Sequence, residues 1–131
     1  VILIGGSVCL MNDTFLAVLE HEGVVTIISS NAGAYHVVNT WNSYVKADGD
    51  KLYIPAAGMH SIEQDLIEND QVLLTIGSRE VEGLVGPGTG FHVSGTASFI
   101  SSGEILDQMK AEFPFLTRVL EVKVTGIEQK I

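Results

Sequence analysis

The stretch Phe91-His92-Val93-Ser94-Gly95-Thr96-Ala97-Ser98-Phe99 alternates apolar or small residues with polar ones. A period of two residues is typical of a β-strand that buries one face and exposes the other. Outward from this stretch, five more strands are predicted at residues 24–30, 35–46, 51–55, 72–76 and 120–125. Turn residues such as Asp48-Gly49 favour hairpins between neighbouring strands. The sequence therefore predicts a mainly β protein, a six-stranded antiparallel barrel with helices at its periphery.

Three short helices are predicted between the strands. Asp13 is expected to cap the first helix. The second is predicted at residues 61–69, where Ser61 and Gln64 have the spacing of a capping box. The third is predicted at residues 103–113, directly before a proline that would end it.

Composition excludes several kinds of partner. The chain has 131 residues, the size of one domain, and a mean hydropathy of +0.32. That hydropathy is high for a small monomer, so we expect a partner subunit to cover some apolar surface. The net charge of −9 argues against a nucleic acid or an anionic membrane as partner. An anionic ligand would need local backbone donors and one or two nearby cations.

Few residues suit metal or disulfide chemistry. Cys9 is the single cysteine, so neither an intramolecular disulfide nor a cysteine-based zinc site is expected, which fits a reducing cytoplasm. The four histidines lack metal-ligand spacing, and no serine lies in the Gly-x-Ser-x-Gly pattern of a hydrolase. Residues 1–10 are mostly apolar and too short to span a bilayer. We expect them to be an extension outside a domain that covers residues 11–131.

The first candidate binding segment is Val38-Asn39-Thr40-Trp41-Asn42-Ser43-Tyr44. On one continuous strand, residues 39, 41 and 43 would share one face and residues 40, 42 and 44 the other, so neither face is cleanly apolar. Polar groups on both sides of a strand need partners, which a polar ligand or a subunit interface would supply. An exposed edge strand of mixed polarity would give the same pattern.

Two further segments combine small residues with a change of chain direction. Residues 55–62 contain Ala56-Ala57-Gly58, which would let the backbone approach a flat ligand, and then helix N–H groups that suit a phosphate. An ordinary strand-to-helix loop would show the same pattern. Residues 77–90 are glycine-rich and are predicted to be a loop, in which Gly88 could contact a ligand through its backbone. This loop matches neither a Walker loop nor a dinucleotide fingerprint.

These segments occur in the order found in a known family. The segments Asn39-Thr40-Trp41-Asn42-Ser43-Tyr44, Gly58-Met59-His60, Gly77-Ser78-Arg79 and Gly86-Pro87-Gly88-Thr89-Gly90-Phe91 resemble the pyridoxamine 5'-phosphate oxidase-like FMN-binding split-barrel superfamily. Within it, the resemblance is to the small FMN-binding proteins of sulfate-reducing bacteria, from about Met11 to Ile131. It implies a split barrel that forms a homodimer, with one non-covalent FMN at each end of the dimer interface.

The resemblance also implies which residues contact FMN. They are Asn39, Thr40 and Trp41 at the flavin and its ribityl chain; Pro55, Ala56, Ala57, Gly58 and Met59 along the ring edge; Ser61 and Ile62 at the phosphate; and Phe115 and Ile131 near the ring. No catalytic residue and no metal ligand is expected.

The chain departs from the family pattern at the phosphate. The pattern has Lys-Thr directly after Met-His, whereas this chain has Ser61 and Ile62, so one positive charge and one hydroxyl are missing. Lys46 and Arg79 are candidate replacements for that charge. Near the ring, Phe115 stands in place of a tryptophan and the C-terminal isoleucine in place of a leucine, which keeps an apolar wall.

Three functions follow from these observations. The first is an FMN-dependent electron carrier with an unknown redox partner protein, in which the protein sets the burial and charge around the flavin. The second is a flavin enzyme, either a flavin reductase or a pyridoxamine phosphate oxidase-like enzyme. The oxidase would need cations for a second phosphate, and the chain has seven lysines and arginines in total. The third is a split barrel in which FMN binding is weakened or lost.

Overall fold

The structure of the protein is a computed structural model that describes residues 3–4, 7–8 and 11–131. Its strands are β1 (Leu3–Ile4), β2 (Ser7–Val8), β3 (Val24–Asn31), β4 (Ala34–Trp41), β5 (Lys46–Asp48), β6 (Lys51–Ala56), β7 (Gln71–Glu82), β8 (Pro87–Ile100) and β9 (Arg118–Gln129). Its helices are α1 (Asp13–Leu19), α2 (His60–Glu68), α3 (Glu104–Glu112) and a 3-10 helix, η1 (Asn42–Tyr44). The extension expected at residues 1–10 lies largely outside the described residues and stays a prediction.

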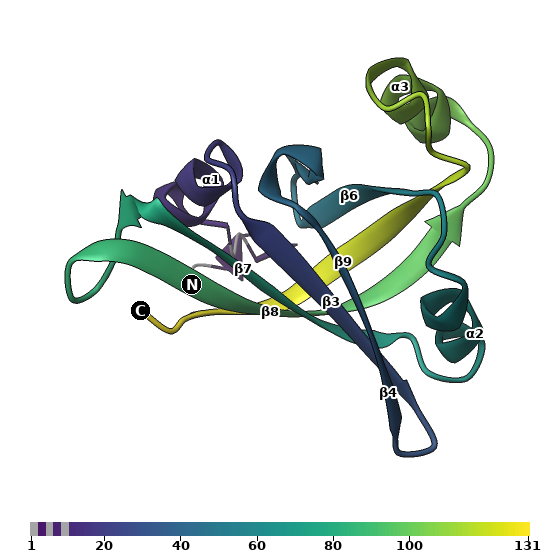
Figure 1. Ribbon diagram of the computed structural model, residues 1–131, viewed down its shortest axis with the longest axis horizontal. Coiled ribbons are helices and arrows are strands. Elements are labelled where there is room, and N and C mark those ends of the chain that lie inside the picture. The colour runs from purple at the N-terminus through teal and green to yellow at the C-terminus, as the bar shows by residue number, and fades with distance from the viewer. Residues whose placement is uncertain (1–2, 5–6, 9–10) are drawn as a thin grey trace.

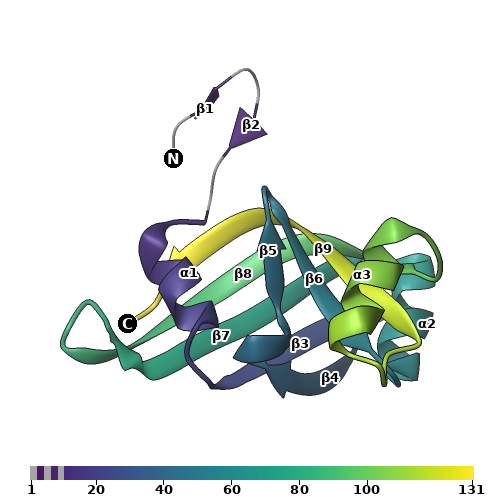
Figure 2. The same cartoon turned by 90° about the horizontal axis from the view of Figure 1, so that it is seen from above.

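Seven strands form one antiparallel sheet in the order β4-β3-β7-β8-β9-β6-β5. The long strands coil around one another, and α3 lies at one end of the molecule (Figure 1). Seen from above, α1 lies toward the end opposite α2 and α3 (Figure 2). β4 and β5 are the two edges of the sheet, so the barrel is open between them. The predicted mainly β, antiparallel split-barrel class is therefore confirmed.

The sheet has seven strands instead of six because the strand predicted at residues 35–46 is interrupted. Asn42 is fully buried, and its side-chain Nδ2 donates to carbonyl oxygens of α1, of the α1–β3 connection and of β7 at 3.1, 2.9 and 3.0 Å. These bonds hold the chain inward, so β4 ends at Trp41 and η1 leads to β5. The Nδ2 group of Asn42 thus finds its acceptors within the chain, whereas its buried Oδ1 has no hydrogen-bond partner among the described residues.

The prediction that residues 77–90 form a glycine-rich loop is wrong. β7 and β8 continue as paired strands through most of it, with Gly77 opposite Gly90. The glycines here permit close backbone approach: a Cβ on Gly83 would lie 2.1 Å from the carbonyl oxygen of Gly88. Paired strands need such small residues where two backbones are this close.

Both predicted helix caps also differ from the structure. Asn12, not Asp13, caps α1, because its Oδ1 accepts from the backbone N–H of Phe15 at 2.8 Å. α2 begins one residue early, after Met59, whose φ of 63° turns the chain into the helix. Ser61 therefore lies inside the first turn and is exposed, so it does not act as the cap of a capping box.

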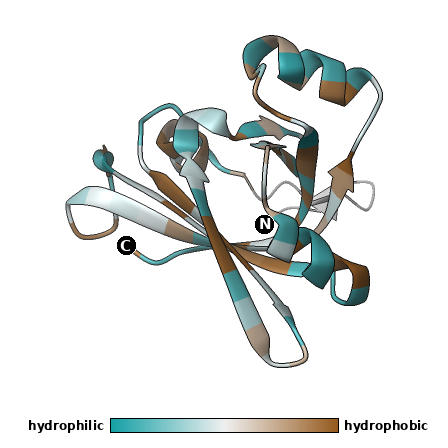
Figure 3. Ribbon diagram, turned by 45° about the vertical axis from the view of Figure 1, so that its right-hand side comes forward, coloured by the Kyte–Doolittle hydropathy of each residue, from teal (hydrophilic) through white to brown (hydrophobic). Residues whose placement is uncertain are grey.

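The core lies on the inner face of the sheet. Its largest fully buried side chains come from β3, β6, β7, β8, β9 and α1, and Phe15 packs edge-on against Phe91 with ring centroids 5.3 Å apart. A second, smaller cluster under α3 contains Tyr53, Met109 and Phe113. Hydrophobic and hydrophilic residues alternate along the long strands, as Figure 3 shows. This is the pattern expected of strands with one buried face.

α2 is attached to the β3–β4 hairpin by a buried carboxylate. Asp65 of α2 accepts hydrogen bonds from Ser29 Oγ at 2.6 Å and His36 Nδ1 at 2.8 Å. These bonds hold the pKa of the Asp65 carboxyl below its ordinary value, with the Ser29 bond as the larger cause. The ionised Asp65 thereby fixes the helix that follows the candidate phosphate segment.

Candidate functional site

The opening of the barrel lies between β4 and the β5–β6 hairpin, which η1 connects directly. β4 supplies the first three predicted site residues. Thr40 is buried, whereas Trp41 is 46% exposed. Asn39 is exposed, and its Oδ1 accepts from Thr26 Oγ1 at 2.9 Å. The outer edge of β4 pairs with no strand among those described, so its backbone groups are available there.

The second half of β6 is buried but has no neighbouring strand on the side of this opening among the described residues. β5 is short and pairs only with Lys51–Tyr53, which leaves Ile54–Ala56 without a neighbouring strand on that side among the described residues. Pro55 lies in this stretch, where a residue without an N–H is tolerated. Ala56 has no exposed surface, and Ala57 is exposed. The Ala56 carbonyl oxygen already accepts from the backbone N–H of Thr117 at 2.9 Å, so the predicted ring-edge segment has accessible surface only from Ala57 onward.

The chain then enters the predicted phosphate segment at the beginning of α2. Space is open around Gly58, since a Cβ built there would meet nothing within 4 Å. Met59, the N-cap residue, makes no side-chain capping bond, so the first N–H groups of the helix lack a side-chain acceptor. Ser61 is exposed, but the side chain of Ile62 is 2% exposed and belongs to the interior. Ile62 can thus offer its backbone and not its side chain.

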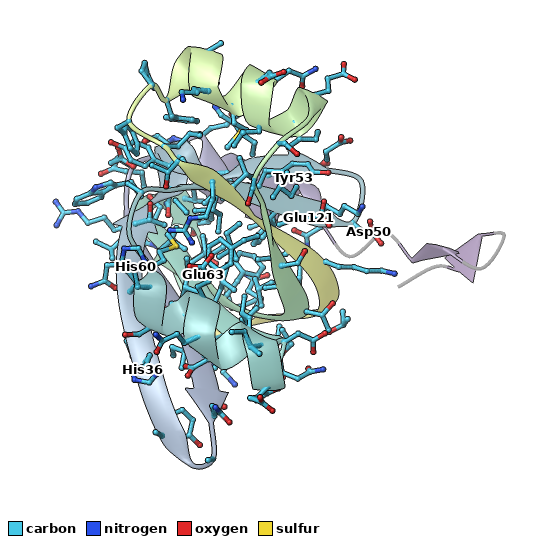
Figure 4. The ribbon with its side chains drawn as sticks, turned by 90° about the vertical axis from the view of Figure 1, so that its right-hand side faces the viewer. His36, Asp50, Tyr53, His60, Glu63 and Glu121 are labelled. Carbon is cyan, nitrogen blue, oxygen red and sulfur yellow. The ribbon has the colours of Figure 1, made fainter. Side chains whose placement is uncertain are left out.

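Arg118 of β9 lies beside this helix end. It pairs with Ala56 in the sheet, its Nη2 donates to the carbonyl oxygen of Gly58, and its Nη1 lies 2.9 Å from Glu63 Oε2. The guanidinium also stacks 4.7 Å from the ring centroid of Phe99, and the side chain is 12% exposed. His60 and Glu63 both lie at the beginning of α2 in Figure 4.

The two cations that the sequence offered as replacements are engaged elsewhere. Lys46 Nζ lies 2.7 Å from Glu112 of α3 and 5.5 Å from the ring centroid of Phe113. Arg79 is on β7 with 94% of its side chain exposed, beside the neighbouring Glu80. Neither forms an ion pair or a hydrogen bond with the described residues of α2, so their positions do not support Lys46 or Arg79 as the replacement cation.

A separate hollow of about 610 Å³ lies on the outer face of β7 and β8. Its floor includes Gly77 and Gly90, which face each other across the two strands and have no side chains to fill it. Gly88 and Ile131 also line this hollow. The C-terminal residue is held there because its carbonyl oxygen accepts from Thr89 Oγ1 at 2.7 Å.

Phe115 lies in the α3–β9 connection, against Tyr44 of η1, the segment that connects β4 to β5 at the barrel opening. Its ring centroid is 5.6 Å from that of Tyr44 and 6.1 Å from that of Phe113. Half of its side chain is exposed. It can therefore serve as an apolar wall for something outside the chain.

The structure divides the predicted site residues into four groups within one chain, of which Phe115, beside Tyr44 of η1, is one. Asn39, Thr40 and Trp41 lie on β4; Pro55 to Ile62 form a continuous path from β6 into α2; Gly88 and Ile131 lie at the hollow. Sequence reasoning missed Arg118, because nothing in the pattern of β9 distinguishes a cation that folds back over α2 from a surface arginine. It also missed Thr89 as the anchor of the C-terminus.

Among the described residues, no group of three or more His, Cys, Asp or Glu side chains could hold a metal ion. No helix in that part of the chain is long and apolar enough to cross a membrane.

Comparison with known proteins identifies the family. The sequence pattern of the family described as pyridoxamine 5'-phosphate oxidase matches residues 11–131. The chain belongs to this family. It is 41% identical over 119 residues to a protein named FMN-binding protein from Nitratidesulfovibrio vulgaris (strain DSM 19637 / Miyazaki F), which covers 90% of this chain and 97% of that protein.

Solved structures agree on the fold. HupZ of Group A Streptococcus superposes with a TM-score of 0.70 at 13% identity, covering 86% of this chain and 88% of that one. An FMN-binding protein from Syntrophomonas wolfei subsp. wolfei gives a TM-score of 0.64 at 16% identity, covering 82% and 76%. At these identities, the likeness establishes the fold alone.

Proposed function

We propose that this protein binds FMN non-covalently and acts as an electron carrier. The observation that carries the proposal is the 41% identity, over nearly the whole length of both chains, to a protein named for FMN binding. The role as an electron carrier is the more specific claim, and it rests on the sequence resemblance described above.

The residues at the barrel opening fit the three parts of FMN. The exposed Ala57 directly after β6 suits the edge of the flavin ring, and the exposed face of Trp41 suits its apolar surface. The uncapped N–H groups at the beginning of α2, with open space at Gly58, suit the phosphate. Among these, the residues proposed to contact the flavin ring come first along the chain, and those proposed to contact the phosphate follow them.

A homodimer is part of the proposal. Four large apolar side chains on the β3–β4 hairpin are substantially exposed: Val24 at 49%, Tyr35 at 72%, Val37 at 60% and Trp41 at 46%. A second copy would cover this surface, which a small monomer rarely leaves in water. The glycine-floored hollow on the same sheet would then lie against the partner. The single cysteine is consistent with a cytoplasmic location.

FMN, when bound, would supply the electron transfer, and the protein would set its environment. The net charge of −9 disfavours adding an electron to the site and would lower the reduction potential. A pyridoxamine phosphate oxidase activity would need a second phosphate site. Four of the seven lysines and arginines, apart from Arg118, are already beside carboxylates, which makes that activity the weaker alternative.

The test is a titration of the flavin-free protein with FMN, followed by flavin fluorescence. The proposal expects quenching at sub-micromolar FMN with one site per chain. Absence of quenching and of any flavin absorption in the purified protein would overturn it. Steady-state oxidation of NADH or NADPH by the FMN-loaded protein separates the carrier from a flavin reductase, because a carrier without its partner should show negligible turnover.

A further inference from the structure

The candidate site contains a buried cation, Arg118, whose hydrogen-bonding capacity is incompletely used. Arg118 Nη1 is buried and has no hydrogen-bond partner among the described residues, although Glu63 Oε2 lies 2.9 Å away. That contact therefore contributes charge attraction without the geometry of a hydrogen bond. The buried Nη1 group therefore keeps N–H hydrogens that no well-aligned acceptor takes up, and a differently placed oxygen could use them.

Arg118 differs in position from the other cations of the chain. All seven lysines and arginines are in the described region, and the other ion-paired ones keep 40% to 94% of their side chains exposed. Arg118 keeps 12%, because it is held between Phe99 and the start of α2. A cation in this position acts with less screening by water than one on the surface.

The position coincides with the uncapped end of α2. Arg118 Nη2 is bonded to the Gly58 carbonyl oxygen, one residue before Met59 caps the helix. Glu63, which faces Arg118 through Nη1, is a negative charge in the first turn of the same helix. Without Arg118, that carboxylate would repel an anion bound at the helix N–H groups.

We propose that Arg118 is the cation that recognises the FMN phosphate, bonding it through Nη1 while Nη2 stays on Gly58. This inference rests on the proposed function, since it assigns one residue at the proposed cofactor site. Guanidinium suits a phosphate because its planar N–H groups match phosphate oxygens. Glu63 holds the side chain in place in the flavin-free protein and competes with the phosphate for it.

The experiment compares FMN with riboflavin, which has the same ring and ribityl chain but no phosphate. Arg118→Gln is expected to raise the Kd for FMN about ten- to hundredfold and to change the Kd for riboflavin less than about threefold. Arg118→Lys keeps the charge without the planar group and should fall between. Lys46→Gln, which removes a charge paired with Glu112, is the matched control and should leave both Kd values unchanged.

A second variant, Glu63→Gln, tests the same inference without removing Arg118, so it does not depend on whether Arg118→Gln folds. Glu63→Gln leaves Arg118 in place and removes the competing carboxylate, so it should tighten FMN binding about two- to tenfold while riboflavin binding stays the same. Equal weakening of FMN and riboflavin by Arg118→Gln, together with weakening by Glu63→Gln, would overturn the inference and leave Arg118 as a structural tether. Wild-type protein that binds riboflavin and FMN equally would also overturn it. Wild-type protein that binds neither would overturn the proposed function itself.

Discussion

The two faces of the central sheet differ in what they contribute. On the inner face, Val25, Ile76 and Phe91 lie side by side across β3, β7 and β8, each at most 2% exposed. On the outer face, Thr26 and Thr75 occupy the neighbouring row, close to a hollow floored by glycine. The inner face accounts for the fold of one chain. The outer face leaves apolar side chains and a hollow uncovered, which a chain folding only for itself would not require.

The largest expected effect on stability comes from removing a large side chain from the inner face. Phe91→Ala should lower the free energy of unfolding by about 3–5 kcal/mol, because it leaves a cavity against Phe15. Val37→Ala on the outer face, where the side chain is 60% exposed in the single chain, should change the free energy of unfolding of the dissociated chain by less than about 0.5 kcal/mol. Urea unfolding followed by circular dichroism measures both. Similar losses for the two variants would contradict the division into faces.

The next largest effect on stability is expected to differ between Gly77 and Gly90, which face each other across β7 and β8. A Cβ on Gly77 would lie 2.8 Å from the carbonyl oxygen of Thr89, whereas one on Gly90 would meet Ile131 Cγ1 at 3.5 Å. Gly77→Ala should therefore destabilise the protein by about 1–3 kcal/mol, and Gly90→Ala by less than about 0.5 kcal/mol. Thermal unfolding of the two variants under identical conditions is the measurement. A more damaging Gly90→Ala would show that the hollow is not free space.

A smaller, pH-dependent effect is expected at the attachment of α2. Because the folded-state pKa of Asp65 lies below its ordinary value of 3.8, its stabilisation is complete above that value and is lost as the pH falls through the folded-state pKa. Asp65→Asn should thus be less stable than wild type at neutral pH, and the difference should shrink in acid. Ser29→Ala keeps the carboxylate and should shift the wild-type profile part of the way. A pH-independent difference would rule out this role for the charge.

The smallest effect on the chain's own fold is expected at the β3–β4 surface. Val37→Lys should leave the circular dichroism spectrum unchanged and yet weaken self-association, because it places a charge on the apolar patch. Light scattering coupled to size exclusion should give a mass near twice 14.0 kDa for wild type and near that value for the variant. A wild-type mass of one chain would remove the dimer from the proposal.

The sequence predicted the fold class because hydrophobic alternation is a local signal, as along β8. It could not predict the break at Asn42, since that depends on carbonyl groups brought from α1 and β7. The glycine-rich segment was misread because glycine marks close backbone approach as well as loops. The path from Pro55 to Ser61 was placed by resemblance, whereas Arg118 required the three-dimensional pairing of β6 with β9.

The central claim is that the barrel opening binds FMN. The most direct measurement is the visible absorption spectrum of protein purified without added flavin, repeated after incubation with excess FMN and removal of the unbound fraction. The account predicts flavin bands that stay with the protein, at about one FMN per chain. A colourless protein after both steps would contradict it, and the chain would then be a split barrel of this family that serves another ligand.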